Sequence, residues 1–101
     1  MKRLCLIVLI SIFLGGCAQQ IEPKEQVVSK CIELCNSKLD TQDLNNGPCL
    51  GLIANDWVCD VAHNPRQAVD NIQENQCSEF REGKAKHFIE VDPKCELIRA
   101  V

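Results

Sequence analysis

The sequence predicts a small α+β domain in which an N-terminal amphipathic helix packs on a C-terminal β-hairpin and disulfides staple the fold. Three observations predict this class. Apolar residues recur three or four positions apart between Pro23 and Leu39, two β-prone runs flank Asp92-Pro93-Lys94, and six cysteines lie between residues 31 and 95. A chain of 101 residues with three phenylalanines and one tryptophan buries only a small core. Disulfides, worth about 2 to 4 kcal/mol each, then carry a large share of the stability.

The predicted helix spans Pro23 to Leu39 and presents one apolar face. That face consists of Val27, Val28, Cys31, Ile32, Cys35 and Leu39. Residues four apart lie on the same side of a helix, so both cysteines point into the core. Two cysteines at this spacing are poorly oriented to bond to each other. We therefore expect each of them to bond a different segment.

The middle of the chain is expected to hold turns and two short elements. Asn46-Gly47-Pro48 breaks the chain after the helix. Between Cys49 and His63 the apolar positions fit a short helical face, although so short a run also fits a strand. The residues of that face are Trp57, Val58, Val61 and Ala62. Asn64-Pro65 then predicts a helix start, with the helix running to about Ile72 and a loop continuing to Ser78.

The C-terminal stretch carries the clearest strand signal. Lys86 to Val91 and Cys95 to Val101 are β-prone runs on either side of a proline turn, which predicts a hairpin. We expect its exposed edge to be protected by the alternating charges of Lys86, Glu90 and Arg99, or to be covered by the helix.

The cysteines predict a disulfide framework. Cys5 lies in the N-terminal apolar run and Cys17 at its end, which leaves an even set of six: Cys31, Cys35, Cys49, Cys59, Cys77 and Cys95. Six cysteines allow fifteen connectivities. We expect Cys77 to bond Cys95 across the base of the hairpin, and Cys31 and Cys35 to bond Cys49 and Cys59 in either order.

The N-terminus has the make-up of a secretory signal. Met1-Lys2-Arg3 is positively charged, and the apolar run from Leu4 to Leu14 has eleven residues, far short of the roughly 20 that a membrane span needs. Leu14-Gly15-Gly16-Cys17 resembles the lipobox of bacterial and archaeal lipoproteins. This resemblance covers residues 1–17 only. The alternative is that residues 4–14 form a buried helix or a short membrane anchor and that the cysteine is incidental.

The resemblance implies a processed and lipidated protein. Residues 1–16 are then a cleaved signal peptide, residues 17–24 the lipidated Cys17 and a short tether, and residues 25–101 a small cysteine-rich domain. Two or three acyl chains hold such a domain on a bilayer, on the extracytoplasmic side of the cell membrane or the outer membrane. Ala18 in place of an aspartate is compatible with the outer membrane. If Cys17 is not lipidated, its odd thiol favours dimers of a secreted protein.

The charge balance limits the partners. Without Lys2 and Arg3, nine basic residues stand against fourteen acidic ones. This excess of acid argues against nucleic acid as a partner and against electrostatic attraction to an anionic bilayer. The expected partners are the membrane, through the lipid on Cys17, and a surface protein or glycan.

One segment, residues 56–66, is dense in polar and aromatic side chains and is the expected place of a binding patch. The patch consists of Asp56, Trp57, Asp60, His63 and Arg66. Trp57 is expected to be buried against a disulfide, the alternative being an exposed anchor for a partner. The charged members fit a polar pocket and equally fit a solvated face on which Asp60 and Arg66 pair loosely.

Catalytic signals are missing from the sequence. It has no Cys-x-x-Cys, Gly-x-Ser-x-Gly or His-Glu-x-x-His motif and no glycine-rich phosphate loop. We therefore expect neither an enzyme nor a cofactor. The alternative is a metal-binding or enzymatic accessory of the envelope that uses Cys59, His63 and His87, because Cys-x3-His suits zinc. Residues 56–66 and 87–93 are also faintly similar to uncharacterised cysteine-rich exported proteins of archaea, a likeness that implies no activity.

Overall fold

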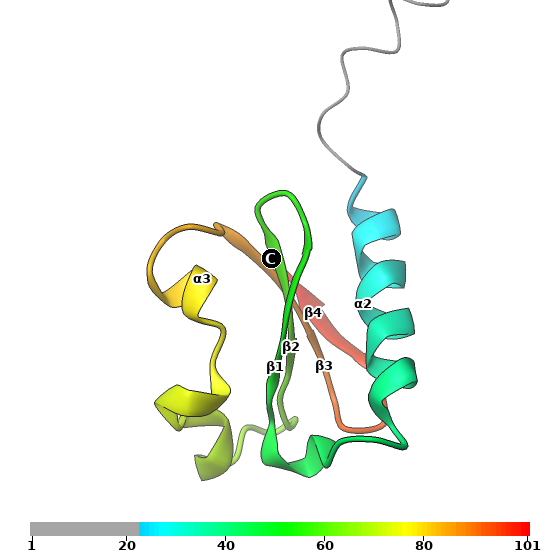
Figure 1. The fold of residues 1–101 in the computed structure, drawn as a ribbon, viewed down its shortest axis with the longest axis vertical. Helices are drawn as coiled ribbons and strands as arrows, with labels where there is room; N and C mark the ends of the chain where they lie inside the picture. The colour runs from blue at the N-terminus through cyan, green and yellow to red at the C-terminus, as the bar shows by residue number, and fades with distance from the viewer. Residues whose placement is uncertain (1–22) are drawn as a thin grey trace, which may run out of the picture.

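A computed structural model describes residues 23–101 of the chain. Helix α2 (Lys24–Lys38) is followed by a four-stranded sheet (Figure 1). The strands are β1 (Cys49–Ala54), β2 (Trp57–Val61), β3 (His87–Val91) and β4 (Leu97–Ala100), in the order β1-β2-β3-β4. The outer pairs are antiparallel and the central pair β2-β3 is parallel.

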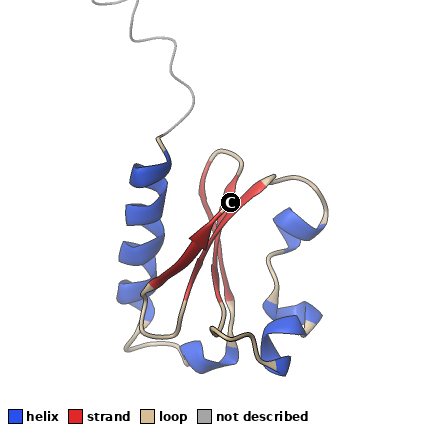
Figure 2. Cartoon of the chain, turned by 180° about the vertical axis from the view of Figure 1, so that it is seen from behind, coloured by secondary structure: helices blue, strands red, loops and turns tan. Residues whose placement is uncertain are grey.

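The long crossover that the parallel pair requires forms a layer of its own. Residues 62–86 make this connection and contain 3-10 turns at Ala68–Asn71 and Gln73–Asn75 and the short helix α3 (Ser78–Arg81). In Figures 1 and 2 the sheet stands between α2 on one side and this connection on the other. Helix α2 contacts all four strands, so its packing partner is the whole sheet.

Side chains alternate between the two faces of the central strands, as strand geometry requires. From β2, Trp57, Cys59 and Val61 join the core under α2, whereas Val58 belongs to a second cluster with Cys77 and Ala85. From β3, the core under α2 receives Ile89 and Val91. The even-numbered residues of both strands therefore face the crossover.

The helix and the hairpin are confirmed with small changes of boundary. Val27, Cys31 and Cys35 are fully buried on the inner face of α2, as the apolar spacing predicts. Strands β3 and β4 pair antiparallel around a turn held by Asp92, whose carboxylate accepts the N–H groups of Lys94 and Glu96 at 2.9 Å.

The structure settles the middle of the chain at two places. Residues 57–62, whose apolar positions fit a short helical face but also a strand, form strand β2, because β2 pairs on both sides with β1 and β3, and this pairing outweighs a weak local periodicity. The helix expected from Pro65 to Ile72 is reduced to the 3-10 turn at Ala68–Asn71. The Asp70 carboxylate accepts the N–H of Gln67 at 2.9 Å, and the backbone at Ile72 is extended, which ends the turn.

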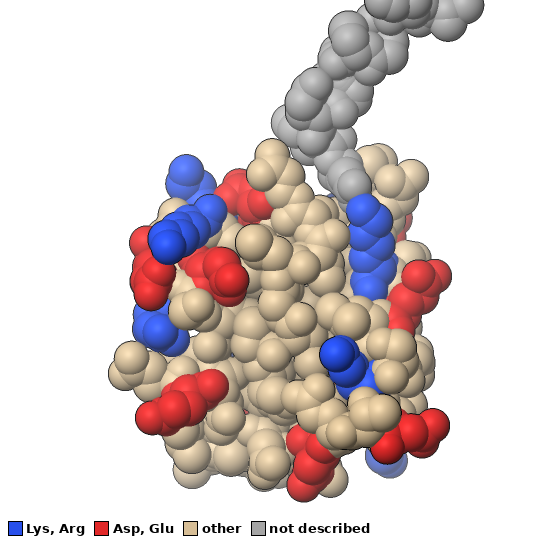
Figure 3. Space-filling model, in the orientation of Figure 1, with Lys and Arg blue, Asp and Glu red and all other residues tan. Residues whose placement is uncertain are grey.

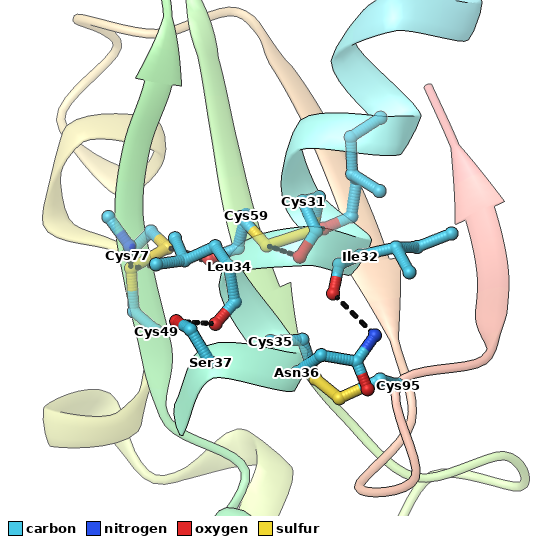
Figure 4. The surroundings of a disulfide bond; sticks show 12 residues. Cys31, Ile32, Leu34, Cys35, Asn36, Ser37, Cys49, Cys59, Cys77 and Cys95 are labelled. Atoms are coloured by element: carbon cyan, nitrogen blue, oxygen red, sulfur yellow. Dashed lines mark hydrogen bonds between the residues drawn. A yellow bond between two sulfur atoms is a disulfide. The ribbon is translucent and has the colours of Figure 1, made fainter. Parts of the chain in front are cut away.

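Three disulfides join the layers: Cys31–Cys59, Cys35–Cys95 and Cys49–Cys77 (Figure 4). Cys31–Cys59 is one of the expected bonds, whereas the expected bond of Cys35 to Cys49 or Cys59 is wrong, because Cys35 bonds Cys95. The predicted Cys77–Cys95 bond is wrong, because Cys95 packs in the core under α2 and Cys77 packs on the opposite face of the sheet.

The N-terminal predictions fall outside the described residues. The signal segment, Cys17 and most of the tether precede residue 23. Between residues 23 and 101, no helix has both the length and the apolar composition needed to cross a membrane.

Candidate functional site

A pocket of about 350 Å³ lies between the crossover and the sheet face that is turned away from α2. The strands contribute Val58, Asp60, Phe88 and Glu90, and the crossover contributes Arg66, Gln76, Cys77, Phe80 and Arg81. The rings of Phe80 and Phe88 meet edge to face with their centroids 5.0 Å apart. The pocket therefore combines an aromatic wall with a group of charged side chains.

Two carboxylates lie side by side on the sheet face of the pocket. Asp60 of β2 and Glu90 of β3 are direct partners in the parallel register. Neighbouring strands are about 4.8 Å apart, and paired residues point to the same face. The sheet therefore fixes the two acidic side chains next to each other.

Glu90 is buried, with 5% of its surface exposed, and is paired with two arginines. Arg66 Nη1 lies 2.8 Å from Glu90 Oε2, and Arg99 Nε lies 3.4 Å from Glu90 Oε1. The expectation that Glu90 protects an exposed edge is wrong, because β3 is a central strand between β2 and β4. The negative charge of Glu90 is therefore neutralised by Arg66 and Arg99 in the wall of the pocket.

Asp60 lacks such a partner. Among the buried side-chain oxygen and nitrogen atoms of residues 23–101, Asp60 Oδ1 is the one that accepts no hydrogen bond. Burial, and then the neighbouring charge of Glu90, raise the pKa of Asp60 to about 7, against the smaller opposing effects of Arg66 and of a hydrogen bond from the backbone of Val61. A carboxyl group of this kind exchanges a proton near neutral pH and gains from any donor or cation that reaches it.

Arg66 is held in place from three directions. Besides Glu90, its guanidinium donates to the Asp70 carbonyl oxygen at 3.0 Å and to Asn71 Oδ1 at 3.2 Å. The loose pairing expected between Asp60 and Arg66 is replaced by this arrangement. Arg66 thus belongs to the fixed wall of the pocket.

Asp70 organises the loop beside the pocket. Its carboxylate accepts the backbone N–H groups of His63 and Gln67, each at 2.9 Å, and His63 Nδ1 lies 3.0 Å from Asp70 Oδ1. Burial opposes its charge, but these backbone N–H groups and the His63 ring together hold the pKa of Asp70 below its ordinary value. His63 therefore stabilises the loop through Asp70 and does not line the pocket.

The structure divides the predicted binding patch. Asp60 and Arg66 line the pocket, whereas Asp56 and Trp57 lie at the other end of β2. Trp57 is 9% exposed in the core under α2, together with Cys31 and Cys59, and it stacks on His87 with ring centroids 4.7 Å apart. The expectation of a buried tryptophan is confirmed, so Trp57 is not an exposed anchor.

The alternative metal site is not assembled. The sulfur of Cys59 is bonded to Cys31. His87 pairs with Trp57 at the start of β2, while His63 follows the end of that strand, so four or more residues of strand separate the histidines by roughly 13 Å or more. Within residues 23–101, the group with metal-ligand atoms in mutual reach is Cys49, Asp60 and Cys77, and its two cysteines form a disulfide.

Apart from Asp60, Arg66 and the disulfide cysteine Cys77, sequence reasoning missed the residues of the pocket: Val58, Gln76, Phe80, Arg81, Phe88 and Glu90. One signal for Glu90 was present, because it and Asp60 each interrupt an apolar β-prone run, in Val-Cys-Asp-Val and Phe-Ile-Glu-Val. A charge within such a run is expected to be paired or functional. The crossover residues carry no comparable signal, because only the tertiary fold brings them to the sheet.

The outer surface has charges of both signs. On the face shown in Figure 3, basic and acidic side chains are intermixed, and neither sign gathers into a patch. This face has no basic stripe of the kind that binds nucleic acid.

The chain matches no protein family model, and neither a curated protein nor a solved structure is significantly similar to it. The pocket around Asp60 is therefore the site from which a function has to be argued.

Proposed function

We propose that this chain is a lipid-anchored extracytoplasmic domain that binds a small organic cation in the pocket between the sheet and the crossover. One observation carries the binding part: a buried carboxyl oxygen of Asp60 has no partner in a pocket with an aromatic wall. Buried polar atoms are almost always hydrogen-bonded, and an exception is typical of functional sites.

The charges of the pocket favour a cation over an anion. Glu90 already holds Arg66 and Arg99, and Arg66 is fixed further by Asp70 and Asn71. Arg81 donates to the Gln73 carbonyl oxygen at 3.4 Å. The unmet demand of the pocket is therefore for a positively charged donor at Asp60, which would also offset the energetic penalty of its buried negative charge.

The walls of the pocket define the rest of the ligand. Val58, Phe80 and Phe88 offer apolar and aromatic surface, and aromatic faces attract cations as well as apolar groups. A volume of about 350 Å³ is at the lower end of the range for ligand pockets. A primary amine with one ring or a short alkyl body fits this description.

Different observations support the lipid anchor and the oxidising compartment. The lipobox resemblance at Leu14-Gly15-Gly16-Cys17 supports lipidation, and three disulfides among residues 23–101 are typical of an oxidising compartment. In this proposal α2 follows the short tether after Cys17, and Cys35–Cys95 fixes it to the C-terminal hairpin. The domain then stays close to the bilayer.

The binding proposal is tested with three probes of similar size but different charge. The full chain, purified in detergent, is titrated with phenethylammonium, 2-phenylethanol and 3-phenylpropanoate, and amide chemical shifts are recorded by NMR. We expect saturable shifts around Asp60 and Phe88 with the cation, and binding at least tenfold weaker with the other two probes.

Paired variants make the result specific. Asp60→Asn removes the charge and is expected to abolish preference for the cation. Asp56→Asn makes the same change on a carboxylate outside the pocket, and binding should persist. Equal affinity for all three probes, or binding that is unchanged in Asp60→Asn, would contradict the proposal.

A further inference from the structure

The Cys49–Cys77 disulfide borders the same pocket as Asp60. Sγ of Cys49, Sγ of Cys77 and a carboxylate oxygen of Asp60 all lie within 4.8 Å of one another. A single water molecule can bridge two groups at this separation. An acidic proton is thus within one relay step of a sulfur–sulfur bond.

This disulfide is also the most accessible of the three that the described residues form. Cys31, Cys35 and Cys59 are fully buried, and Cys95 is 5% exposed, so both other disulfides lie inside the core under α2. Cys77 is also 5% exposed but lines the pocket, and Cys49 is partly exposed, unlike any cysteine of the other two disulfides. In Figure 4 these two cysteines lie to the left of Cys31–Cys59, and their sulfur atoms are 3.9 Å (Cys49) and 3.6 Å (Cys77) from the carbonyl oxygen of Cys59.

We propose that Cys49–Cys77 undergoes thiol–disulfide exchange with a small thiol that enters the pocket, and that Asp60 donates the proton to the departing sulfur. The incoming thiolate attacks Cys77 Sγ and forms a mixed disulfide with it. The bond between Cys77 and Cys49 breaks, its electron pair passes to Cys49 Sγ, and this sulfur takes the proton of the Asp60 carboxyl group. A second thiol then releases Cys77 as a thiol, so that two external thiols are oxidised to one disulfide while Cys49–Cys77 is reduced.

The surroundings of Cys49 suit a departing sulfur. The backbone N–H of Gly51 donates to Cys49 Sγ at 3.1 Å, a contact that stabilises negative charge on this atom. Gly51 makes this contact at an irregularity between β1 and β2, where the register shifts between Cys49 and Gly51. The bulge thus directs a donor to the sulfur, and the bond breaks more readily when its leaving group is stabilised.

Burial and the charges around Asp60 together determine whether its carboxyl group is protonated. Glu90 of β3 and Asp70 of the crossover favour protonation, Arg66 opposes it, and Arg81 of α3 lines the same pocket. Burial is the largest influence and raises the pKa of Asp60 to about 7. The carboxyl group is therefore available as an acid below about pH 7, and above this pH its negative charge repels the incoming thiolate.

The experiment measures how fast each disulfide is reduced in the folded protein. The full chain in detergent is exposed to dithiothreitol between pH 5 and pH 9, free thiols are alkylated at set times, and the sites are identified by peptide mass spectrometry. Each rate constant is divided by the thiolate concentration at that pH. We expect Cys49–Cys77 to react at least tenfold faster than the other two, with a thiolate-normalised rate constant that falls as pH rises through 7.

Variants assign this behaviour to Asp60. Asp60→Asn should lower the normalised rate constant below pH 6 by at least tenfold and make its pH profile flat. Asp56→Asn should leave the profile unchanged. Loss of all three disulfides at one common rate, or a wild-type profile without a fall near pH 7, would overturn the proposal even if Asp60→Asn fails to fold. The assay contains no amine, so its outcome is separate from that of the binding test.

Discussion

Asp70 shows how one buried side chain shapes a loop that local sequence did not predict. Its carboxylate, which is 3% exposed as a residue, accepts two backbone N–H groups and faces the His63 ring. An asparagine of the same size offers one acceptor oxygen in place of two and adds donors where none is needed. The loop that holds Arg66 in the pocket wall therefore depends on the carboxylate.

We expect Asp70→Asn to destabilise the fold by about 2 kcal/mol, since a buried donor left unsatisfied costs about 1 to 3 kcal/mol. Urea unfolding at pH 7 measures the change. Asp43→Asn is the control, because the Asp43 carboxylate also accepts a backbone N–H, that of Asn45 at 3.0 Å, but in an exposed turn. An equal loss in both variants would contradict the role assigned to Asp70.

The buried Asp60 carboxyl group makes the stability of the fold depend on pH. Its pKa is about 7 in the folded state and 3.8 ordinarily, so the folded state binds the proton more tightly. The stabilising contribution is complete below about pH 4 and is lost as pH rises to about 7, at up to about 1.4 kcal/mol per pH unit.

Asp60→Asn is expected to remove this slope. The difference in unfolding free energy between variant and wild type should move in favour of the variant from pH 4 to pH 7 and then stay constant. Urea unfolding at several pH values measures it. A constant difference across this range would mean that Asp60 titrates normally.

Among the elements, Gly47 in the turn before β1 packs against Asp70 of the crossover. It has φ of +66°, and a Cβ atom on it would lie 2.6 Å from Asp70 Oδ1. Gly83 also has a positive φ, of +81°, but a Cβ atom there would meet nothing within 4 Å. Comparing substitutions at the two glycines therefore separates the effect of backbone strain from that of a steric clash.

Gly83→Ala is expected to destabilise the fold by about 1 to 2 kcal/mol, the effect of the left-handed conformation alone. Gly47→Ala should destabilise it by more, because Asp70 must also move and loosen its hydrogen bonds. Thermal unfolding of both variants makes the comparison. Equal losses would contradict the close packing of Gly47 on Asp70.

Elements with a strong local pattern were predictable. The three- and four-residue spacing of Val27, Cys31 and Cys35 was sufficient for α2, and the proline turn was sufficient for the C-terminal hairpin. For β2 the local sequence fits both a helix and a strand, because its partners β1 and β3 settle its conformation, and β3 begins 26 residues after β2 ends. Periodicity within a short run contains no information on such partners.

The disulfides and the pocket show the same limit. That Cys31 and Cys35 bond different segments followed from helix geometry, and it is confirmed. Their partners, and the meeting of Asp60 with Glu90, depend on the parallel pairing of β2 and β3, for which local sequence has no signal. Charged residues within β-prone runs were the available clue.

In the whole molecule, one face of the sheet packs under α2 in the stable core, and the opposite face forms the pocket. Two fully or nearly fully buried disulfides tie α2 to one face, while Cys49–Cys77 joins the crossover to β1 on the other. This separation lets the pocket disulfide react while the core under α2 stays closed.

The anchor proposal predicts where the whole molecule resides in the cell. Cys17→Ser should release the protein from membranes, because no thiol remains to carry the lipid, while the disulfides of the domain still form. Fractionation followed by intact mass measurement tests this. Retention of Cys17→Ser in the membrane fraction would contradict lipidation at this residue.

Titration of the Asp60 side chain shows directly whether it is the perturbed carboxyl group on which the proposed binding and exchange depend. NMR of the side-chain carboxyl carbon, recorded from pH 3 to pH 9 on the uniformly labelled full chain, gives the pKa without reference to any ligand or thiol. We expect an inflection for Asp60 at about pH 7 that is missing in Asp60→Asn. An inflection near the ordinary value of 3.8 would contradict the account, because Asp60 would then be a solvated carboxylate with no unmet demand.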